Sequence, residues 1–348
     1  MKNQRSKWLL GGMLVMAMWN CKSPEAEPTP YESGAFIINS GNIADKNGTI
    51  SFLSRTSATP SLDIFNTTNA RALAGKVQDY TEVDGKGLVL VDNNAVGEDR
   101  VEIVEVETFK SMTTLASPEI ENPRRVVNVG FNKAYVSCWD TTGNATNSFL
   151  KPGYILLVNT ASRTAVKKIP AIKGVERMVV VGSEVFAGST PSSGDNTLLV
   201  INLDTDEVKE RIDFGSTPEP IALDADGRLW IQTGRDLVQF NPTSRAIEKR
   251  LTFPEVPGSV MLGADRRTFY YTMSGRTYAI LTNSTTSIGR VFAARSFNAL
   301  GVDPRTRRIY GSVVPSLTQA GYVLRYEDTG ALIDSIGAEI APSGFYFR

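Results

Sequence analysis

The sequence has no histidine at all, although it is 348 residues long. Histidine is the commonest metal ligand and the commonest general base in proteins, so its absence removes the usual centres of hydrolases and metalloenzymes. The chain also lacks a G-x-S-x-G nucleophile elbow and an H-E-x-x-H helix. A hydrolase such as a lactonase would need a site rebuilt from carboxylates and arginines alone. We therefore predict no catalytic residues, no metal site and no cofactor, and we do not expect an enzyme.

Cysteine is almost as scarce, with two residues, Cys21 and Cys138. A secreted domain with so few cysteines has to be held together by its core and not by disulfides. Cys21 directly follows a leader and is the predicted lipidation site, although Asn20 stands where lipoprotein precursors usually have a small residue. Residues 22–30 are rich in Pro and Glu, so residues 21–31 are predicted to be an anchor and flexible tether. The alternative is an unlipidated periplasmic protein with a Cys21–Cys138 disulfide.

Long apolar runs are also missing, apart from one at the N-terminus. Residues 1–20 combine the basic residues Lys2, Arg5 and Lys7 with the apolar run Trp8–Trp19, which is typical of a signal peptide. That run is shorter than the roughly 20 residues of a membrane-spanning helix. Nothing after Cys21 is expected to cross a membrane, so membrane contact is expected through the lipid anchor only. The expected location is the outer membrane at the cell surface, with its periplasmic face as the alternative.

The sequence shows no excess of positive charge. Lysine plus arginine and aspartate plus glutamate each number 37. Nucleic-acid binding normally needs a strongly basic face, and neither the total nor any local run provides one. We expect no nucleic-acid partner.

Convincing helical periodicity is absent too, whereas short β-rich runs recur about every 40 to 50 residues, the spacing of a propeller or solenoid. In the clearest unit, residues 215–247, four strands follow one another, and Asp226-Gly227 supplies a tight hairpin turn. We predict an all-β fold, a seven-bladed β-propeller with four-stranded blades in a single domain over residues 32–348. Its innermost strands are predicted at Lys76–Val83, Arg125–Val129, Glu176–Val181, Pro220–Asp224, Ser259–Gly263, Asn298–Asp303 and Ser343–Phe347. The last of these is expected to pair with Gly34–Ser40, so that the N- and C-terminal strands close the ring.

Two kinds of segment resemble known families. Tyr154–Ile169 and Thr197–Gly215 look like the YVTN-type propeller repeat. Longer segments resemble the YncE-like surface lipoproteins of Bacteroidetes: Gly34–Phe52, Leu73–Asn94, Asn122–Asp140 and Ala341–Phe347. The resemblance implies a surface lipoprotein that binds a nutrient and presents it to a TonB-dependent outer-membrane transporter, because that group includes cobalamin-capturing lipoproteins. Cobalamin or another corrinoid is the ligand it implies. The alternative from another class is a protein- or glycan-binding scaffold propeller at the cell surface.

In a propeller, the loops before the first strand and after the second strand of each blade gather on one face around the central channel. Trp139, at the base of the longest such loop, is suited to stacking on a planar ligand. Its alternative role is packing between blades. Arg124 and Arg177 occupy matching positions in consecutive blades and could clamp a phosphate or carboxylate. The alternative is pairing with a carboxylate such as Glu119 or Glu176.

The same reasoning places four further ligand-binding candidates on this face: Asn39, Asn93, Arg235 and Arg276. The Asp/Asn-rich segment at residues 92–99 offers oxygen ligands for Ca²⁺ but lacks the EF-hand pattern. We interpret it as a hairpin loop.

Overall fold

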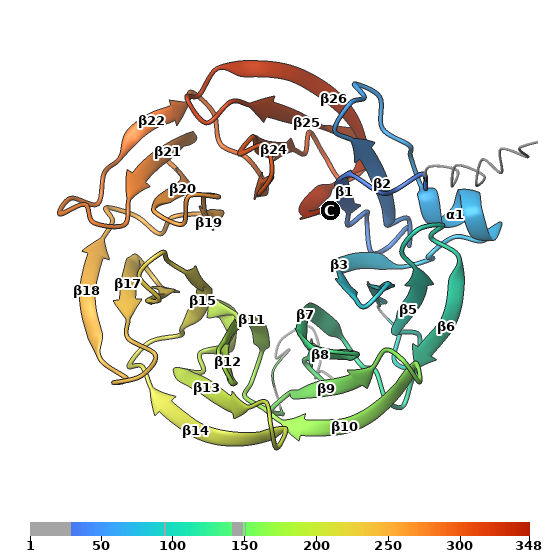
Figure 1. Ribbon diagram of the computed structural model, residues 1–348, viewed down its shortest axis with the longest axis horizontal. Helices are drawn as coiled ribbons and strands as arrows, with labels where there is room; N and C mark the ends of the chain where they lie inside the picture. The colour runs from blue at the N-terminus through green and yellow to red at the C-terminus, as the bar shows by residue number, and fades with distance from the viewer. Residues whose placement is uncertain (1–28, 94, 141–148, 150) are drawn as a thin grey trace, which may run out of the picture.

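The computed structural model describes residues 29–93, 95–140, 149 and 151–348. The predicted signal peptide and the predicted lipidation site at Cys21 lie outside the described residues. The described chain is built almost entirely of antiparallel strands arranged in seven sheets around a central opening (Figure 1). The prediction of an all-β, seven-bladed propeller is confirmed.

In six of the blades the chain runs from the central opening outward, and in the closing blade the innermost strand comes from the C-terminal end (Figure 1). The innermost strands are β3 (Lys76–Val83), β7 (Pro123–Gly130), β11 (Val175–Val181), β15 (Glu219–Leu223), β19 (Val260–Leu262), β23 (Leu300–Val302) and β27 (Pro342–Phe347). The second strands are β4 (Lys86–Asp92), β8 (Lys133–Cys138), β12 (Glu184–Ser189), β16 (Leu229–Thr233), β20 (Thr268–Met273), β24 (Ile309–Val313) and β1 (Gly34–Asn39).

The third strands are β5 (Arg100–Glu105), β9 (Tyr154–Asn159), β13 (Thr197–Asn202), β17 (Asp236–Phe240), β21 (Arg276–Leu281), β25 (Ala320–Tyr326) and β2 (Thr49–Ser54). The outermost strands are β6 (Ser111–Ala116), β10 (Thr164–Pro170), β14 (Glu207–Asp213), β18 (Ile247–Thr252), β22 (Arg290–Ala293) and β26 (Leu332–Ile340). Two short helices, α1 (Ile64–Asn69) and η1 (Pro191–Ser193), lie in the connections.

The two ends of the chain close the ring, as the sequence predicted. β27 pairs antiparallel with β1, and β1 pairs with β2. This seventh blade has three regular strands, because the outer position beside β2 holds only a single bridge between Ser61 and Phe52. Closure in this way joins the first and last strands of the domain within one blade, so neither chain end is left as a separate unpaired strand.

Burial follows the position of each strand in its blade. The second strand β4 is buried almost throughout, whereas the outermost strand β14 alternates between exposed and half-buried residues. Middle strands are covered by blades on both faces and can be uniformly apolar, while outer strands meet water on one side. The core therefore consists of clusters between neighbouring blades, and the described residues contain no helix long and apolar enough to cross a membrane.

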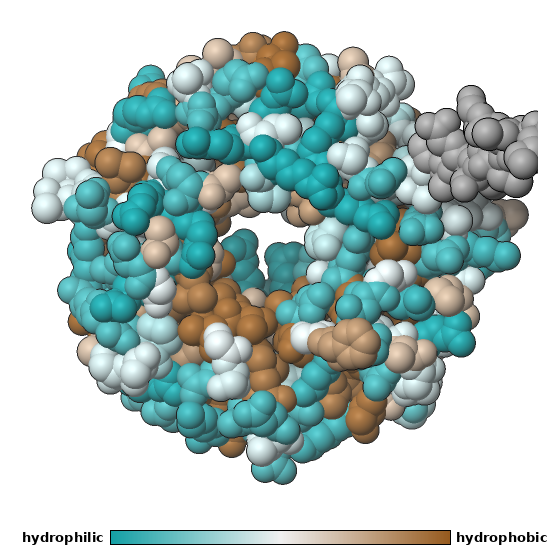
Figure 2. All heavy atoms as spheres, in the orientation of Figure 1, coloured by the Kyte–Doolittle hydropathy of each residue, from teal (hydrophilic) through white to brown (hydrophobic). Residues whose placement is uncertain are grey.

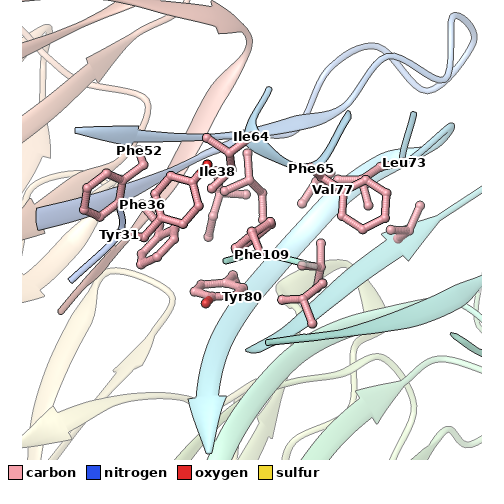
Figure 3. Close-up of a cluster of buried hydrophobic side chains, with 14 residues drawn as sticks. Tyr31, Phe36, Ile38, Phe52, Ile64, Phe65, Leu73, Val77, Tyr80 and Phe109 are labelled. Carbon is pink, nitrogen blue, oxygen red and sulfur yellow. The ribbon is translucent and has the colours of Figure 1, made fainter. Parts of the chain in front are cut away.

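One such cluster joins the closing blade to the blade of β3 (Figure 3). Phe36 on β1 packs edge-on against Phe52 at 4.9 Å between ring centroids and lies 5.8 Å from Phe109. Tyr31 and Tyr80 complete the aromatic group. Aromatic pairs in tilted contact contribute about 0.5–1.5 kcal/mol beyond their buried area, so this cluster stabilises the junction at which the two chain ends meet.

Candidate functional site

The central channel contains a cavity of about 500 Å³ that is lined from every blade. Residues of all seven innermost strands or their first flanking positions contribute: Asp79, Arg125, Arg177, Pro220, Val260, Leu300 and Phe345. Such a convergence of separate segments on one concave site is typical of ligand-binding cavities.

The upper wall of the channel, where the innermost strands begin, is charged on one side and neutral on the other. Asp79, Arg125 and Arg177, from β3, β7 and β11, line the cavity. Lys76, Arg124, Glu176 and Glu219, the last from the start of β15, are ionisable neighbours of these groups, so the charges come from four consecutive blades. The other three blades contribute Ser259, Asn298 and Ser343 to the cavity. A ligand in the channel would therefore meet charges on one side only.

Arg124, predicted to face the channel mouth, is held by two carboxylates from different blades. Its Nη1 lies 3.1 Å from Asp92 Oδ2 and its Nε lies 3.4 Å from Glu176 Oε2. Its guanidinium also lies over the Trp139 ring, 3.7 Å from the centroid. The pairing with Glu176 was the alternative considered from the sequence, and it uses much of the side chain's capacity for binding an anion.

Trp139 is half-buried at the junction between two blades. Its Nε1–H donates to the carbonyl oxygen of Val175, on β11 of the next blade, at 3.1 Å. Phe149 packs edge-on against it at 4.8 Å, and Arg124 lies over its ring. Trp139 therefore packs between two blades, which was the alternative role considered from the sequence. The loop at residues 141–148, which gave Trp139 its expected role at a loop base, lies outside the described residues.

Arg177 lines the channel cavity and pairs with Glu219 of the following blade, Nε to Oε1, at 2.8 Å. The partner therefore differs from Glu119 and Glu176, the two carboxylates considered from the sequence. Its side chain remains about one-third exposed. Because the pair is open to the channel, a ligand anion can reach the guanidinium without breaking the contact.

Arg125 is the channel residue that sequence reasoning missed. Its Nε is buried and has no hydrogen-bond partner among the described residues. Glu176 forms an ion pair with it at 3.8 Å. Within the described part of the chain the guanidinium makes one hydrogen bond, a long one of 3.4 Å from Nη1 to the carbonyl oxygen of Gln78. Since a guanidinium has five N–H donors and about one-third of this side chain is exposed, Arg125 is under-coordinated by protein groups and its Nη groups are open to the channel.

Asp79 lies opposite Arg125 on the neighbouring strand β3. Its Oδ2 accepts a hydrogen bond from the Val126 backbone N–H at 3.0 Å, and its Oδ1 accepts one from the Tyr80 backbone N–H. Burial raises the pKa of Asp79 above its usual value, although the Arg125 charge opposes that shift. Within the described chain, the hydrogen bonds of Asp79 come from backbone donors and the Arg125 charge acts on it without one, while the Arg125 side chain lines the cavity.

A signal for Arg125 was present in the sequence. Side chains alternate between the two faces of a strand, so of the neighbours Arg124 and Arg125 one had to point away from the other. Only the three-dimensional structure shows that Arg124 is satisfied by carboxylates and Arg125 is not.

The other four predicted contacts fall into two groups. Asn39 and Asn93 are almost completely buried, and their amides donate to neighbouring protein atoms, including Ser51 Oγ and the carbonyl oxygen of Glu98. Arg235 and Arg276 are exposed, at the turns that join second to third strands. Asn39 and Asn93 therefore present little accessible polar surface, while Arg235 and Arg276 remain predicted contacts at the rim.

The acidic segment at residues 92–99 connects β4 and β5, which pair antiparallel. Asp99 accepts hydrogen bonds from the backbone N–H groups of Asn93 and Asn122, at 2.6 Å and 2.7 Å, and so joins two blades. Burial raises the pKa of Asp99 to about 6. Among the described residues, no group of three or more Asp, Glu or Cys side chains is placed to hold a metal ion.

Comparisons with known proteins support the fold and show the family of the chain. A crystal structure of a quinonprotein alcohol dehydrogenase-like protein from Bacteroides thetaiotaomicron is similar, with a TM-score of 0.70 and 14% sequence identity, over 91% of this chain and 78% of that one. At this identity the likeness shows the fold alone. No curated protein sequence matches the chain. A family model described as "Domain of unknown function (DUF5074)" matches residues 33–347, and the chain therefore belongs to the DUF5074 family.

Proposed function

We propose that this propeller is an exported binding protein that captures a small molecule in its central channel through an anionic group. The observation that carries the proposal is the under-coordinated guanidinium of Arg125, beside a cavity of about 500 Å³. About one-third of the Arg125 side chain is exposed, so a ligand in the channel can reach its Nη groups. A carboxylate or phosphate suits them, because either group accepts from a guanidinium through two oxygens.

The surrounding charges favour one anionic group and not several. The basic side chains Lys76, Arg124, Arg125 and Arg177 are matched by four carboxylates around the channel mouth: Asp79, Asp92, Glu176 and Glu219. Glu176 already has Arg124 as a partner, so a ligand anion can bind Arg125 without leaving Glu176 unpaired. A polyanion would meet the remaining carboxylates and be repelled.

At a finer level, we propose that the captured molecule is a nutrient and that a corrinoid is the first compound to test. The support is the resemblance of the sequence to YncE-like surface lipoproteins. Cobalamin carries a single phosphodiester in its nucleotide loop, the kind of group that Arg125 and Arg177 could bind. In this proposal Cys21 anchors the protein at the outer membrane, and the propeller presents its ligand to a TonB-dependent transporter.

The proposal is tested by isothermal titration of the purified protein with cyanocobalamin and with cobinamide, which lacks the nucleotide loop. We expect cyanocobalamin to bind and cobinamide to bind more weakly. Arg125→Gln should weaken cyanocobalamin binding about 10- to 100-fold, the effect of losing one hydrogen bond to a charged group. The matched control is Arg250→Gln, which alters an exposed arginine on the outermost strand β18.

Equal binding by the wild type and Arg125→Gln would place the ligand outside the channel. Absence of binding by both compounds would refute the corrinoid proposal. Binding of a protein or glycan on the same face, unaffected by Arg125→Gln, would instead favour a scaffold propeller. A separate check is genomic, because a nutrient receptor should be encoded beside its transporter.

A further inference from the structure

The side chains that line the channel are partly charged at its upper end and mostly apolar further down. A second cavity, of about 280 Å³, shares five lining residues with the first: Arg177, Ile221, Val260, Met261 and Phe345. It then continues along the later parts of the inner strands, past Ala222, Leu262, Val302 and Phe347. Because the two cavities have walls in common, they form one channel with a charged upper part and an apolar lower part.

The apolar side chains of the lower channel are only half-buried. Ile221, Met261, Leu262, Phe345 and Phe347 each retain partial exposure, although they belong to innermost strands. The space-filling view shows a hollow at the centre of the ring and apolar surface at its edge, on the side where β11 and β15 lie (Figure 2). Apolar surface gathered in a concavity usually marks a binding site, because single exposed apolar residues are scattered in ordinary surfaces.

Arg177 connects the two parts of the channel, because it lines both cavities. Its side chain is about one-third exposed and pairs with Glu219. An anionic group bound between Arg125 and Arg177 would therefore lie at the upper end of the apolar part. Anything covalently attached to that group and directed down the channel would lie against Ile221, Met261 and Phe345.

We infer that the lower channel is an apolar subsite, and that the ligand is an amphiphilic monoanion whose carboxylate or phosphate binds Arg125 and Arg177 while its apolar arm lies against Met261, Val302 and Phe345. The inference rests on the proposed function, since it uses the same anion site, and it adds the chemical class of the ligand. Residues 343–347 of the inner strand β27 run along the channel for roughly 13 Å, at about 3.3 Å per residue. The arm is thus a short chain or a ring system and not a long lipid tail.

The test uses the purified protein and three straight-chain carboxylates, hexanoate, octanoate and decanoate, titrated by calorimetry at one pH and one salt concentration. Each added methylene that becomes buried should tighten binding about 4-fold. Octanol is the matched compound without the anion and should bind at least 10-fold more weakly than octanoate, since a hydrogen bond to a charged group contributes about 1.5–3 kcal/mol.

The key variant is Met261→Gln, which keeps the side-chain length and adds a polar amide in the lower channel. It should weaken decanoate binding about 10-fold and acetate binding less than 2-fold, since acetate has no arm to bury. Met112→Gln is the matched control, because Met112 lies on the outermost strand β6 and is 37% exposed. Val302→Thr, which is nearly isosteric, gives a second readout if Met261→Gln lowers the melting temperature.

The outcomes separate this inference from the proposed function. If affinity is the same for all three carboxylates, the apolar subsite is refuted while the anion site stands. If decanoate and octanol bind equally well and Arg125→Gln has no effect, both ideas fail. If the chain-length series holds but no corrinoid binds, the amphiphile inference stands and the corrinoid proposal is refuted.

Discussion

The ion pair Arg55–Asp303 allows a test of which contacts stabilise the junction that closes the ring. Arg55 follows β2 of the closing blade, and Asp303 follows β23 of the neighbouring blade. The guanidinium binds both carboxylate oxygens, Nε to Oδ2 at 2.7 Å and Nη2 to Oδ1 at 2.9 Å. Its Nη1 donates to Ser33 Oγ at 2.6 Å and to the carbonyl oxygen of Arg348. One side chain thus joins two blades and both ends of the propeller domain.

The effect of Arg55→Ala can be estimated from this geometry. Asp303 is 1% exposed and Arg55 12% exposed, so the pair is shielded from water. Without Arg55, Asp303 keeps only the Arg305 backbone N–H and the Thr306 hydroxyl, each at 2.9 Å. Removing one partner of a buried ion pair typically costs about 3–5 kcal/mol. We expect Arg55→Ala to lower the free energy of unfolding by about 4 kcal/mol.

The matched control is Arg267→Ala, which removes another Arg–Asp pair. Arg267 and Asp226 are 3.4 Å apart, with 58% and 64% of their side chains exposed. Such a surface pair contributes about 0–1 kcal/mol. Urea unfolding followed by tryptophan fluorescence would measure both variants. A loss below about 1 kcal/mol for Arg55→Ala would refute our view that this pair holds the closing junction.

Two further predictions concern buried ionisable groups. Because burial raises the pKa of Asp99 to about 6, the folded state binds its proton more tightly than the unfolded chain does. Asp99 should therefore lower the free energy of unfolding by about 2 kcal/mol as pH rises from 4 to 6. Asp99→Asn should flatten that part of a plot of melting temperature against pH, and an unchanged slope would contradict the assignment. Cys138 is fully buried, and burial raises the pKa of its thiol to about 12, so a Cys21→Ser variant should not react with a disulfide reagent until it is unfolded. Reaction in the native protein would show that the blade opens locally.

The strand pattern could be predicted from the sequence because it depends on neighbouring residues. Lys76–Val83 was placed correctly, and so was the pairing of the last strand with Gly34–Ser40. Alternation, turn residues and the regular spacing of blades are all local signals. The closing blade was harder, because its outer position depends on one bridge at Ser61 that no periodicity marks.

From the sequence, the candidate site could be predicted as one face of the propeller, but not as a set of side-chain contacts. Arg124 and Arg177 were predicted from matching positions in successive blades, but the strand registers match Arg125 to Arg177. Val126 pairs with the fourth residue of β8 and Met178 with the fourth residue of β12. The partners of Arg124 and Arg177 were not fixed, since Asp92 is 32 residues before Arg124 and Glu219 is 42 residues after Arg177. Which arginine remains under-coordinated depends on those long-range contacts, and that is why Arg125 was missed.

Charged side chains are distributed unevenly around the channel, and this distribution supports a binding role for the propeller. Seven blades give seven equivalent inner positions, and a purely structural channel could be filled alike all round. Here four adjacent blades carry the charges, while the other three present Ser259, Asn298 and Ser343. Under the proposed function, a ligand with one anionic group is therefore expected to bind in one orientation, with its anion towards the charged blades. Enlarging the neutral side, for example by Ser259→Leu, should therefore abolish binding without removing any contact to the anion.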